Sequence, residues 1–393
     1  MRVIYLTIDN INDNVILAQT FPFLVQLARL PGVKDVDLFA LQKGDGDRYR
    51  SALPSAGLRV HTARNHGMWH PLTLLHLCRF AVAAWRRAQP ATALVGRNPV
   101  SLLCLLPAAL RRRSRLLLDY RGILSEEYVL QGKIAARGWV HRLLRGLERW
   151  ALRRADAVLC VSEKLRRRTL RWQPITAGKT AVIPCCYDPR LAPWDEAAVA
   201  QAREALNLDA TKDFVLVYSG SLSAWNRPDA IRALFRTMRE QFPRTRLLLL
   251  TGDRTAAESV FGKESGVTIQ SVPHETIQPH LAAGDLGLLL RESHPVNRVA
   301  SPVKFAEYLV SGVPVLVSPG VGDCAAIVHH EHVGYVLGSE PPLLRMIEEI
   351  RANRATLRER CRAVAAHYFD RGRYMDTYRR LFMTEATEGS GPM

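Results

Sequence analysis

A lysine and a glutamate three residues apart give residues 297–315 the clearest chemical pattern in the chain. Ser301 suits the N-cap of a short helix, and Pro302 suits its first position. The unpaired amides at such a helix end attract anions, most often phosphate. Lys304 would lie in the first turn, where the helix dipole disfavours a cation unless an anion holds it there. Glu307 would lie on the same face and could accept two hydrogen bonds from a ribose diol, although an ordinary surface Lys–Glu pair explains the pattern equally well.

Two other segments place small residues directly after predicted strands. Gly220 and Ser221 follow one strand, and Arg227 comes shortly before the next predicted helix. This arrangement offers backbone amides and a guanidinium to a phosphate. Gly252 and Asp253 follow the next strand, and parallel strands bring such ends to one edge of a sheet. Each segment alone is weak evidence, because glycine and serine follow first strands in many α/β proteins.

The elements that would position these residues alternate between short apolar strands and helices. Such alternation is typical of parallel sheets with right-handed helical crossovers. Strands are predicted at residues 3–8, 36–41, 58–62, 93–96, 116–120, 157–161, 181–184, 214–218, 246–250, 267–271, 286–290 and 313–317. Helices are predicted at residues 14–30, 71–89, 99–112, 134–155, 163–172, 228–242, 276–283, 302–311, 341–353 and 355–383.

The chain of 393 residues is too long for one typical domain and suits two. A segment with two prolines and no periodicity, residues 187–195, predicts the boundary between them. The first domain is therefore expected at residues 1–190. The small and polar residues at 384–393 predict a disordered tail.

Four motifs of the second half have a specific order and spacing. They are Tyr218-Ser-Gly-Ser-Leu222, Leu250-Thr-Gly-Asp253, Leu281-Ala-Ala-Gly-Asp285 and the segment 301–315. Together they resemble the donor domain of glycosyltransferase family four, which has the GT-B fold. The likeness is looser in the first half, where it rests on residues 118–122, 155–162 and 182–184.

The resemblance implies an α/β protein with two Rossmann-like domains, whose parallel sheets face a central cleft. Residues 1–190 would form the acceptor-binding domain, and residues 191–365 would form the domain that binds the nucleotide-sugar donor. Residues 366–383 would form a helix that crosses back to the first domain.

The resemblance also assigns roles to single residues of the second half. Glu307 falls at the second glutamate of the family's Glu-x7-Glu motif, which binds ribose, whereas Val299 stands at the first. Ser221 stands where family members usually have an arginine, and Arg227 stands at their loop lysine. Residues expected to compensate are Lys304 and the backbone of Ala300, Ser301, Pro302 and Val303. Residues 10–14 replace the family's usual N-terminal glycine-rich loop.

The expected reaction moves a sugar from a nucleotide sugar to an acceptor, with retention of anomeric configuration. Positive charge at the leaving diphosphate would carry it, so Lys304 and Arg227 are expected to be catalytic, and neither a metal ion nor another cofactor is expected. The acceptor would be a saccharide, and a lipid-linked one of a cell-surface polysaccharide is favoured.

Four residues near the end of the strand at 116–120 are expected on the acceptor side. Asp119 could orient the acceptor hydroxyl as a third catalytic residue, and Arg121 could meet an acceptor phosphate. Glu126 and Glu127 follow closely. A purely structural Asp–Arg pair at the strand end is an equally good interpretation.

Two other functions remain open. One is a module that binds an anionic polymer or nucleic acid and keeps a vestigial donor site. No nucleic-acid-binding motif appears, so a nucleic-acid partner is not expected. The other is a sugar-nucleotide epimerase on the same fold, which would need acid–base groups that the sequence does not identify.

The net charge of +17 lies entirely in the first half, since residues 1–190 have 31 Lys and Arg against 13 Asp and Glu. This excess predicts an anionic partner. The predicted helix 134–155 has an apolar face, expected to be buried, that consists of Trp139, Val140, Leu143, Leu144, Leu147, Trp150 and Ala151. Its opposite ridge of Arg142, Arg145, Arg149 and Arg153, with Arg111–Arg113, could lie against anionic lipid.

The composition, 48% hydrophobic and 23% charged, is typical of a soluble globular protein. No apolar run reaches the roughly 18 residues of a membrane span, and no secretory signal is evident. A cytoplasmic protein, peripheral at the inner face of the membrane, is therefore expected. The seven cysteines lack metal-site spacing. Asp35-Val-Asp37 matches a metal-binding Asp-x-Asp but begins a strand, and Asp45-Gly-Asp47 predicts a turn, so no metal site is expected.

Overall fold

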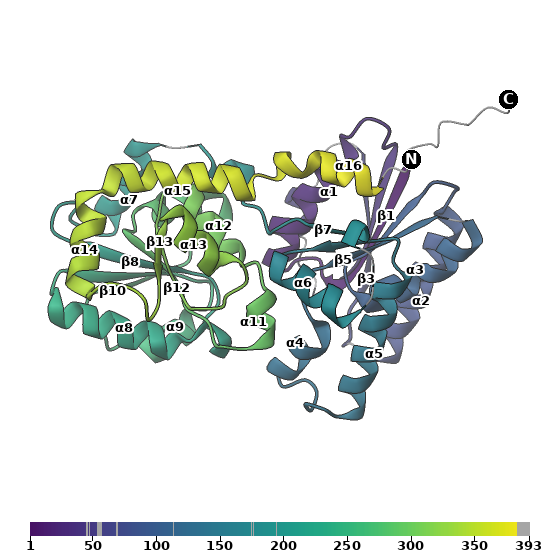
Figure 1. Ribbon diagram of the computed structural model, residues 1–393, viewed down its shortest axis with the longest axis horizontal. Coiled ribbons are helices and arrows are strands. Elements are labelled where there is room, and N and C mark those ends of the chain that lie inside the picture. Colours follow the sequence, from purple (N-terminus) through teal and green to yellow (C-terminus); the bar gives the residue numbers. More distant parts are fainter. Residues whose placement is uncertain are drawn as a thin grey trace. The chain divides into compact units, whose positions relative to one another are not determined.

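The structure is a computed structural model that describes residues 1–382 apart from residues 45, 47, 53–56, 68, 69, 113, 174, 176 and 194. The chain divides into two α/β units (Figure 1). One contains Met1–Pro184 and the segment from Arg371 onward, and the other is Cys185–Asp370. The division precedes the predicted boundary because Tyr187 and Leu191 pack into the core of the second unit. The predicted tail at 384–393, Arg113, Asp45 and Asp47 lie outside the described residues.

The first unit contains a seven-stranded parallel sheet of order β3-β2-β1-β4-β5-β6-β7. Its strands are β1 (Arg2–Asn10), β2 (Asp35–Gln42), β3 (Leu58–Arg64), β4 (Ala93–Gly96), β5 (Arg115–Tyr120), β6 (Ala157–Cys160) and β7 (Thr180–Val182). All seven lie where apolar runs predict them. The order reverses between β1 and β4, and this switch point is where α/β sheets open a crevice for ligands.

Helices cover both faces of this sheet (Figure 1). On one face, α1 (Phe21–Ala28) and α16 (Met375–Phe382) pack with the preceding π-helical turn at Ile16–Thr20. On the other, α3 (Pro99–Arg112) contacts α2 (Pro71–Arg87) and α5 (Trp139–Arg154). The remaining helices are α4 (Leu124–Leu130) and α6 (Glu163–Trp172).

The second unit contains a six-stranded parallel sheet of order β10-β9-β8-β11-β12-β13, with its own switch point between β8 and β11. Its strands are β8 (Phe214–Ser219), β9 (Thr245–Leu250), β10 (Val267–Gln270), β11 (Leu286–Leu289), β12 (Val315–Val317) and β13 (Gly334–Val336). Both units therefore have the topology of the predicted Rossmann-like domains.

The second sheet has an apolar core on each face, and each core is covered by helices (Figure 1). One face carries α8 (Pro228–Gln241), α9 (Arg254–Phe261) and α14 (Leu343–Ala352). The other carries α10 (Ile277–Ala282), α12 (Val303–Val310), α13 (Cys324–Glu331) and α15 (Arg354–Phe369). Two further helices are α7 (Glu196–Ala205) and α11 (Pro295–Val299).

Two of the predicted helices have different limits in the structure. The prediction over 134–155 is wrong at its start, since α5 begins at Trp139 after Gly138, and the sequence did not indicate α4. The prediction over 355–383 is wrong in its continuity, because the backbone is extended at Asp370, between α15 and α16. Glycine lies near both breaks, where its low helix propensity favours an interruption.

The predicted apolar face of α5 is wrong in part. Leu144 and Ala151 are buried, but Trp139 is 76% exposed and Leu143 is 56% exposed. Glu148 faces inward instead, because its carboxylate accepts hydrogen bonds from the amide and the hydroxyl of Ser125, at 3.1 and 2.8 Å. Burial raises the pKa of Glu148 to about 7.

The last helix, α16, packs in the core of the first unit. The rings of Tyr378 and Phe382 lie 4.7 and 6.0 Å from the ring of Phe23, and both are buried. Tyr374 packs against the same core.

The end of β5 carries the predicted Asp–Arg pair. Asp119 is buried, its Oδ1 lies 2.7 Å from Nε of Arg121, and its Oδ2 accepts a hydrogen bond from the Tyr5 hydroxyl at 2.6 Å. The carboxylate therefore links β1, β5 and the loop that follows β5.

We predict that Asp119→Asn lowers the free energy of unfolding by about 1.5–3 kcal/mol, because a buried charge loses its ion pair and one charge-assisted hydrogen bond. Chemical denaturation measures the change. Asp376→Asn is the matched control, since the exposed Asp376–Arg379 pair contributes about 0–1 kcal/mol. Equal stability of Asp119→Asn and the parent would contradict the prediction.

Candidate functional site

The switch point of the second sheet brings several of the predicted residues together. Gly220 and Ser221 follow β8, Arg291 follows the neighbouring β11, and α12 begins beyond the loop after β11. The carboxyl ends of adjacent parallel strands share one edge, so these loops form a common rim.

Lys304 lies over the first loop of this unit. Its Nζ is 4.2 Å from the centre of the Tyr218 ring, which allows a cation–π interaction. Gly220 has a φ of +117°, and a Cβ there would lie 3.1 Å from the same Nζ. The glycine therefore provides both the left-handed backbone and the room that the ammonium occupies.

The start of α12 differs from the prediction. Ser301 is not the N-cap, because its Oγ accepts a hydrogen bond from the Cys185 amide at 3.0 Å, and Pro302 caps the helix without a side-chain bond. The first-turn amides of Val303 and Lys304 precede the first possible intrahelical bond and remain available to an anion. At the other end, Gly312 follows α12 with a left-handed φ of +68°, a conformation that glycine adopts without strain.

The charge of Lys304 is destabilised by its surroundings. Burial, and then the like charge of Arg291, lower the pKa of Lys304 well below its usual value, and Glu307 partly offsets this. The helix dipole also disfavours a cation here. A phosphate group here would stabilise the Lys304 ammonium and would also accept hydrogen bonds from the free amides of α12.

Glu307 lies one turn into α12 and is 7% exposed. Its Oε1 is 2.9 Å from Nε2 of His274, which follows β10, and Nδ1 of His274 is 3.9 Å from Asp188. The hydrogen bond to Glu307 is the main cause that raises the pKa of His274 above 6.5. The Glu307 carboxylate, which is expected to bind a ribose, is therefore held by His274, a residue that no sequence motif indicated.

The other predicted donor residues have varied positions. The Asp253 carboxylate caps α9, since its Oδ1 accepts a hydrogen bond from the Ala256 amide, and Gly252 precedes it in the loop after β9. Arg227 is exposed, with a left-handed backbone directly before α8. Val299 is buried. The Ala300 carbonyl approaches Gly322 so closely that a side chain at position 322 would clash with it.

The switch point of the first sheet carries a different set of charges. Nε of Arg97, after β4, donates a hydrogen bond to Asp9 at the end of β1 over 2.8 Å. Burial raises the pKa of Glu127 to about 7, and its Oε1 lies where a side chain at Gly122 would be. Glu126 lies 3.4 Å from His141 of α5. Asp9 and Arg97 directly follow the strands predicted at 3–8 and 93–96, but neither belongs to a motif that marked it as a site residue.

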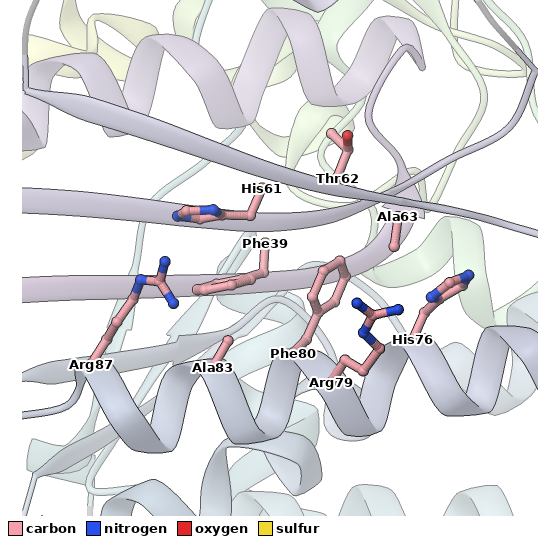
Figure 2. A pocket seen from close by; sticks show the side chains of 9 residues that line it. All are labelled: Phe39, His61, Thr62, Ala63, His76, Arg79, Phe80, Ala83 and Arg87. Atoms are coloured by element: carbon pink, nitrogen blue, oxygen red, sulfur yellow. The ribbon is translucent and has the colours of Figure 1, made fainter.

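A groove of about 360 Å³ lies along β2, β3 and α2 of the first unit (Figure 2). Figure 2 shows Phe39 and Phe80 between the guanidinium groups of Arg79 and Arg87, with His61 on the neighbouring strand. Phe39 and His61 are in mid-strand, so the groove follows the face of the sheet rather than its carboxyl edge. Among the described residues, no group of three or more His, Cys, Asp or Glu side chains could hold a metal ion.

Comparisons with known proteins support the architecture. Residues 27–191 match the family Glycosyltransferase Family 4. HepE of Anabaena, solved in complex with UDP, has a TM-score of 0.68 and 18% identity, covering 96% of this chain and 99% of that chain. A sucrose-phosphate synthase of Thermosynechococcus elongatus has a TM-score of 0.70 and 18% identity, covering 97% and 99%. WaaG, a glycosyltransferase involved in lipopolysaccharide biosynthesis, has a TM-score of 0.65 and 15% identity, covering 97% and 96%. No curated protein sequence matches the chain.

The structural likenesses cover nearly the whole chain and define the fold as GT-B. The family match covers residues 27–191, within the half of the chain that contains the first unit. The GT-B fold inferred from the sequence motifs is thereby confirmed, and the match of residues 27–191 is consistent with the inferred family.

We predict that the His274–Glu307 pair stabilises the protein in mildly acidic solution. Because the folded-state pKa of His274 is raised above 6.5, its contribution is fully present below about pH 6.5 and is lost as the pH rises through the raised value. Denaturant unfolding between pH 5.5 and 8.5 measures this dependence. His274→Gln should remove that part of the pH dependence, whereas His280→Gln, at a half-buried histidine of α10, should keep it. Identical profiles for the parent and His274→Gln would contradict the assignment.

Proposed function

We propose that the second unit binds a nucleotide-sugar donor at the edge formed by the ends of β8 and β11. The observation that carries this is the pair of Lys304 and Glu307 on α12, one cation beside free amides and one carboxylate a turn further on. A phosphate on the amides would leave the ribose within reach of Glu307. HepE, which shares the fold, has been solved with UDP-glucose.

Transfer would need a stabilised diphosphate leaving group more than a protein nucleophile. Lys304 and the first-turn amides of α12 supply positive charge at the developing anion. Arg227 is exposed and adds a further cation when its side chain turns toward the donor. Protein groups therefore take the place of a metal ion or other cofactor, and the anomeric configuration is retained, as the family resemblance implies.

The first unit would bind the acceptor at its own switch point. Both carboxylate oxygens of Asp119 are engaged by Arg121 and Tyr5, so Asp119 acts by holding Arg121 in position for an acceptor phosphate. Glu127 lies beside this loop with a pKa of about 7, and Glu126 pairs with His141. A lipid-linked saccharide of a surface polysaccharide suits a phosphate-binding arginine, and WaaG, of like fold, is involved in lipopolysaccharide biosynthesis.

Peripheral membrane attachment through the first unit is also part of this proposal. Exposed apolar side chains lie on the three helices that cover one face of its sheet, namely Leu75, Val82, Leu103, Leu110, Trp139 and Leu143. The same helices carry the exposed arginines Arg79, Arg86, Arg111, Arg142, Arg149 and Arg153. Apolar groups within a basic surface are what an anionic bilayer binds. No helix among the described residues is long and apolar enough to cross a membrane.

Calorimetric titration with nucleoside diphosphates tests the donor site. Glu307→Ala should weaken binding by about ten- to several-hundredfold, because a carboxylate that binds two hydroxyls makes hydrogen bonds of about 1.5–3 kcal/mol each. Lys304→Ala should lower turnover more than ground-state affinity, because it removes charge from the leaving group. Glu331→Ala, at the half-buried last residue of α13, is the control. If Glu307→Ala bound a nucleoside diphosphate as tightly as the parent, the donor-site assignment would fail.

Vesicle sedimentation tests the membrane surface. The protein should bind phosphatidylglycerol vesicles at low salt and much less at high salt, since each basic residue near the surface contributes about 1 kcal/mol. The double variant Trp139→Ala, Leu143→Ala should bind less, whereas Leu344→Ala, an exposed leucine of the second unit, should not. Equal binding to phosphatidylcholine and phosphatidylglycerol vesicles would remove the proposal.

A further inference from the structure

Arg291 is anchored at the switch edge of the second sheet by neutral groups. It is the second residue after β11, and its amide donates a hydrogen bond to Oγ of Ser318, after β12, at 3.0 Å. Its Nη1 donates to Oδ1 of Asn297 at 3.0 Å. The Asn297 side chain is itself held, since its Nδ2 donates to the Glu292 carbonyl at 2.9 Å. The guanidinium is thus fixed by an amide rather than by a carboxylate.

No carboxylate among the described residues neutralises this guanidinium. Its electrostatic neighbours are Cys324, Tyr218 and Cys185, and its buried Nε has no hydrogen-bond partner. Burial lowers the pKa of Arg291, and the same guanidinium lowers the pKa of Lys304. Two cations therefore lie near the Tyr218 ring. Of the carboxylates in the described part of the chain, Glu307 offsets the charge of Lys304. Glu307 is itself already paired with His274.

Two desolvated cations that are compensated only in part are costly unless an anion joins them. The free amides of α12 and the sheet edge favour a phosphate at this point. Ser221 in the first loop carries no charge, and Arg227 is exposed. We infer that Arg291, positioned by Asn297, binds the diphosphate of the nucleotide-sugar donor alongside Lys304. This inference rests on the proposed donor site and adds to it the residue that supplies the second positive charge. A planar guanidinium can contact two phosphate oxygens at once, which an ammonium cannot do.

Calorimetric titration with UDP, ADP and GDP identifies which of them binds the parent protein, and NMR titration measures the corresponding nucleoside. Arg291→Gln should lower the affinity for the nucleoside diphosphate by about ten- to a hundredfold, the loss expected for charge-assisted hydrogen bonds. The affinity for the nucleoside should change by less than about twofold, because the nucleoside has no phosphate. Arg298→Gln, an exposed arginine on α11, is the matched control and should leave both affinities unchanged.

The variants distinguish this inference from the proposed function. Binding of a nucleoside diphosphate by the parent with no loss in Arg291→Gln overturns the role of Arg291 and leaves the donor site standing. Equal losses for nucleoside and diphosphate overturn it as well, because they indicate a structural role. If Arg291→Gln does not fold, Arg291→Lys can be tested instead, because it keeps the charge but loses the planar group that contacts two phosphate oxygens. It should show an intermediate loss of affinity for the diphosphate and none for the nucleoside. If none of the three diphosphates binds the parent, the proposed function fails and takes this inference with it.

Discussion

The second unit depends on an ammonium group that the fold holds where nearly everything opposes its charge. Lys304 is desolvated, lies in the first turn of a helix and faces the like charge of Arg291. The ring of Tyr218 and the carboxylate of Glu307 compensate only in part. The backbone around it is adapted to this placement: Gly220 leaves room for the ammonium, and Gly312 ends α12 so that the chain returns directly into β12.

Glu307 links this cation to a second one. The same carboxylate that offsets Lys304 also pairs with His274, so one negative charge is shared between an ammonium and an imidazole. A phosphate near Lys304 would relieve that shortage of negative charge. Glu307 would then be freer to accept hydroxyl groups, which makes ribose binding and phosphate binding mutually supportive in the proposed donor site.

The first unit has the same kind of topology but a balanced edge. At its switch point, Arg97 is matched by Asp9 and Arg121 by Asp119. Its large positive excess lies instead on helices such as α5, where exposed arginines are solvated and long-range attraction to an anionic surface acts on the whole unit. In the proposed function, the first unit would therefore provide the attraction to an anionic surface, and the second would bind the phosphate of the donor.

Local sequence determined most of the elements, because apolar runs and helix signals act over a few residues. The positions of β4, α3 and α6 and the glycine that ends α12 follow from such signals. Short helices such as α7, α9 and α13 have weaker signals and were not predicted. The family likeness, which depends on the order of motifs, was also readable from the chain alone.

Tertiary structure decided which side chains meet. Ser301 would be a good cap by its position, but its hydroxyl is taken by the amide of Cys185, 116 residues away. The hydrogen bond between Glu148 and Ser125 sets the inward face of α5. Glu307 of α12 pairs with His274, which follows β10. Arg291 carries no local signal at all. A parallel sheet collects the ends of strands that are distant in sequence, so the charges that define the site become neighbours only when the sheet has formed.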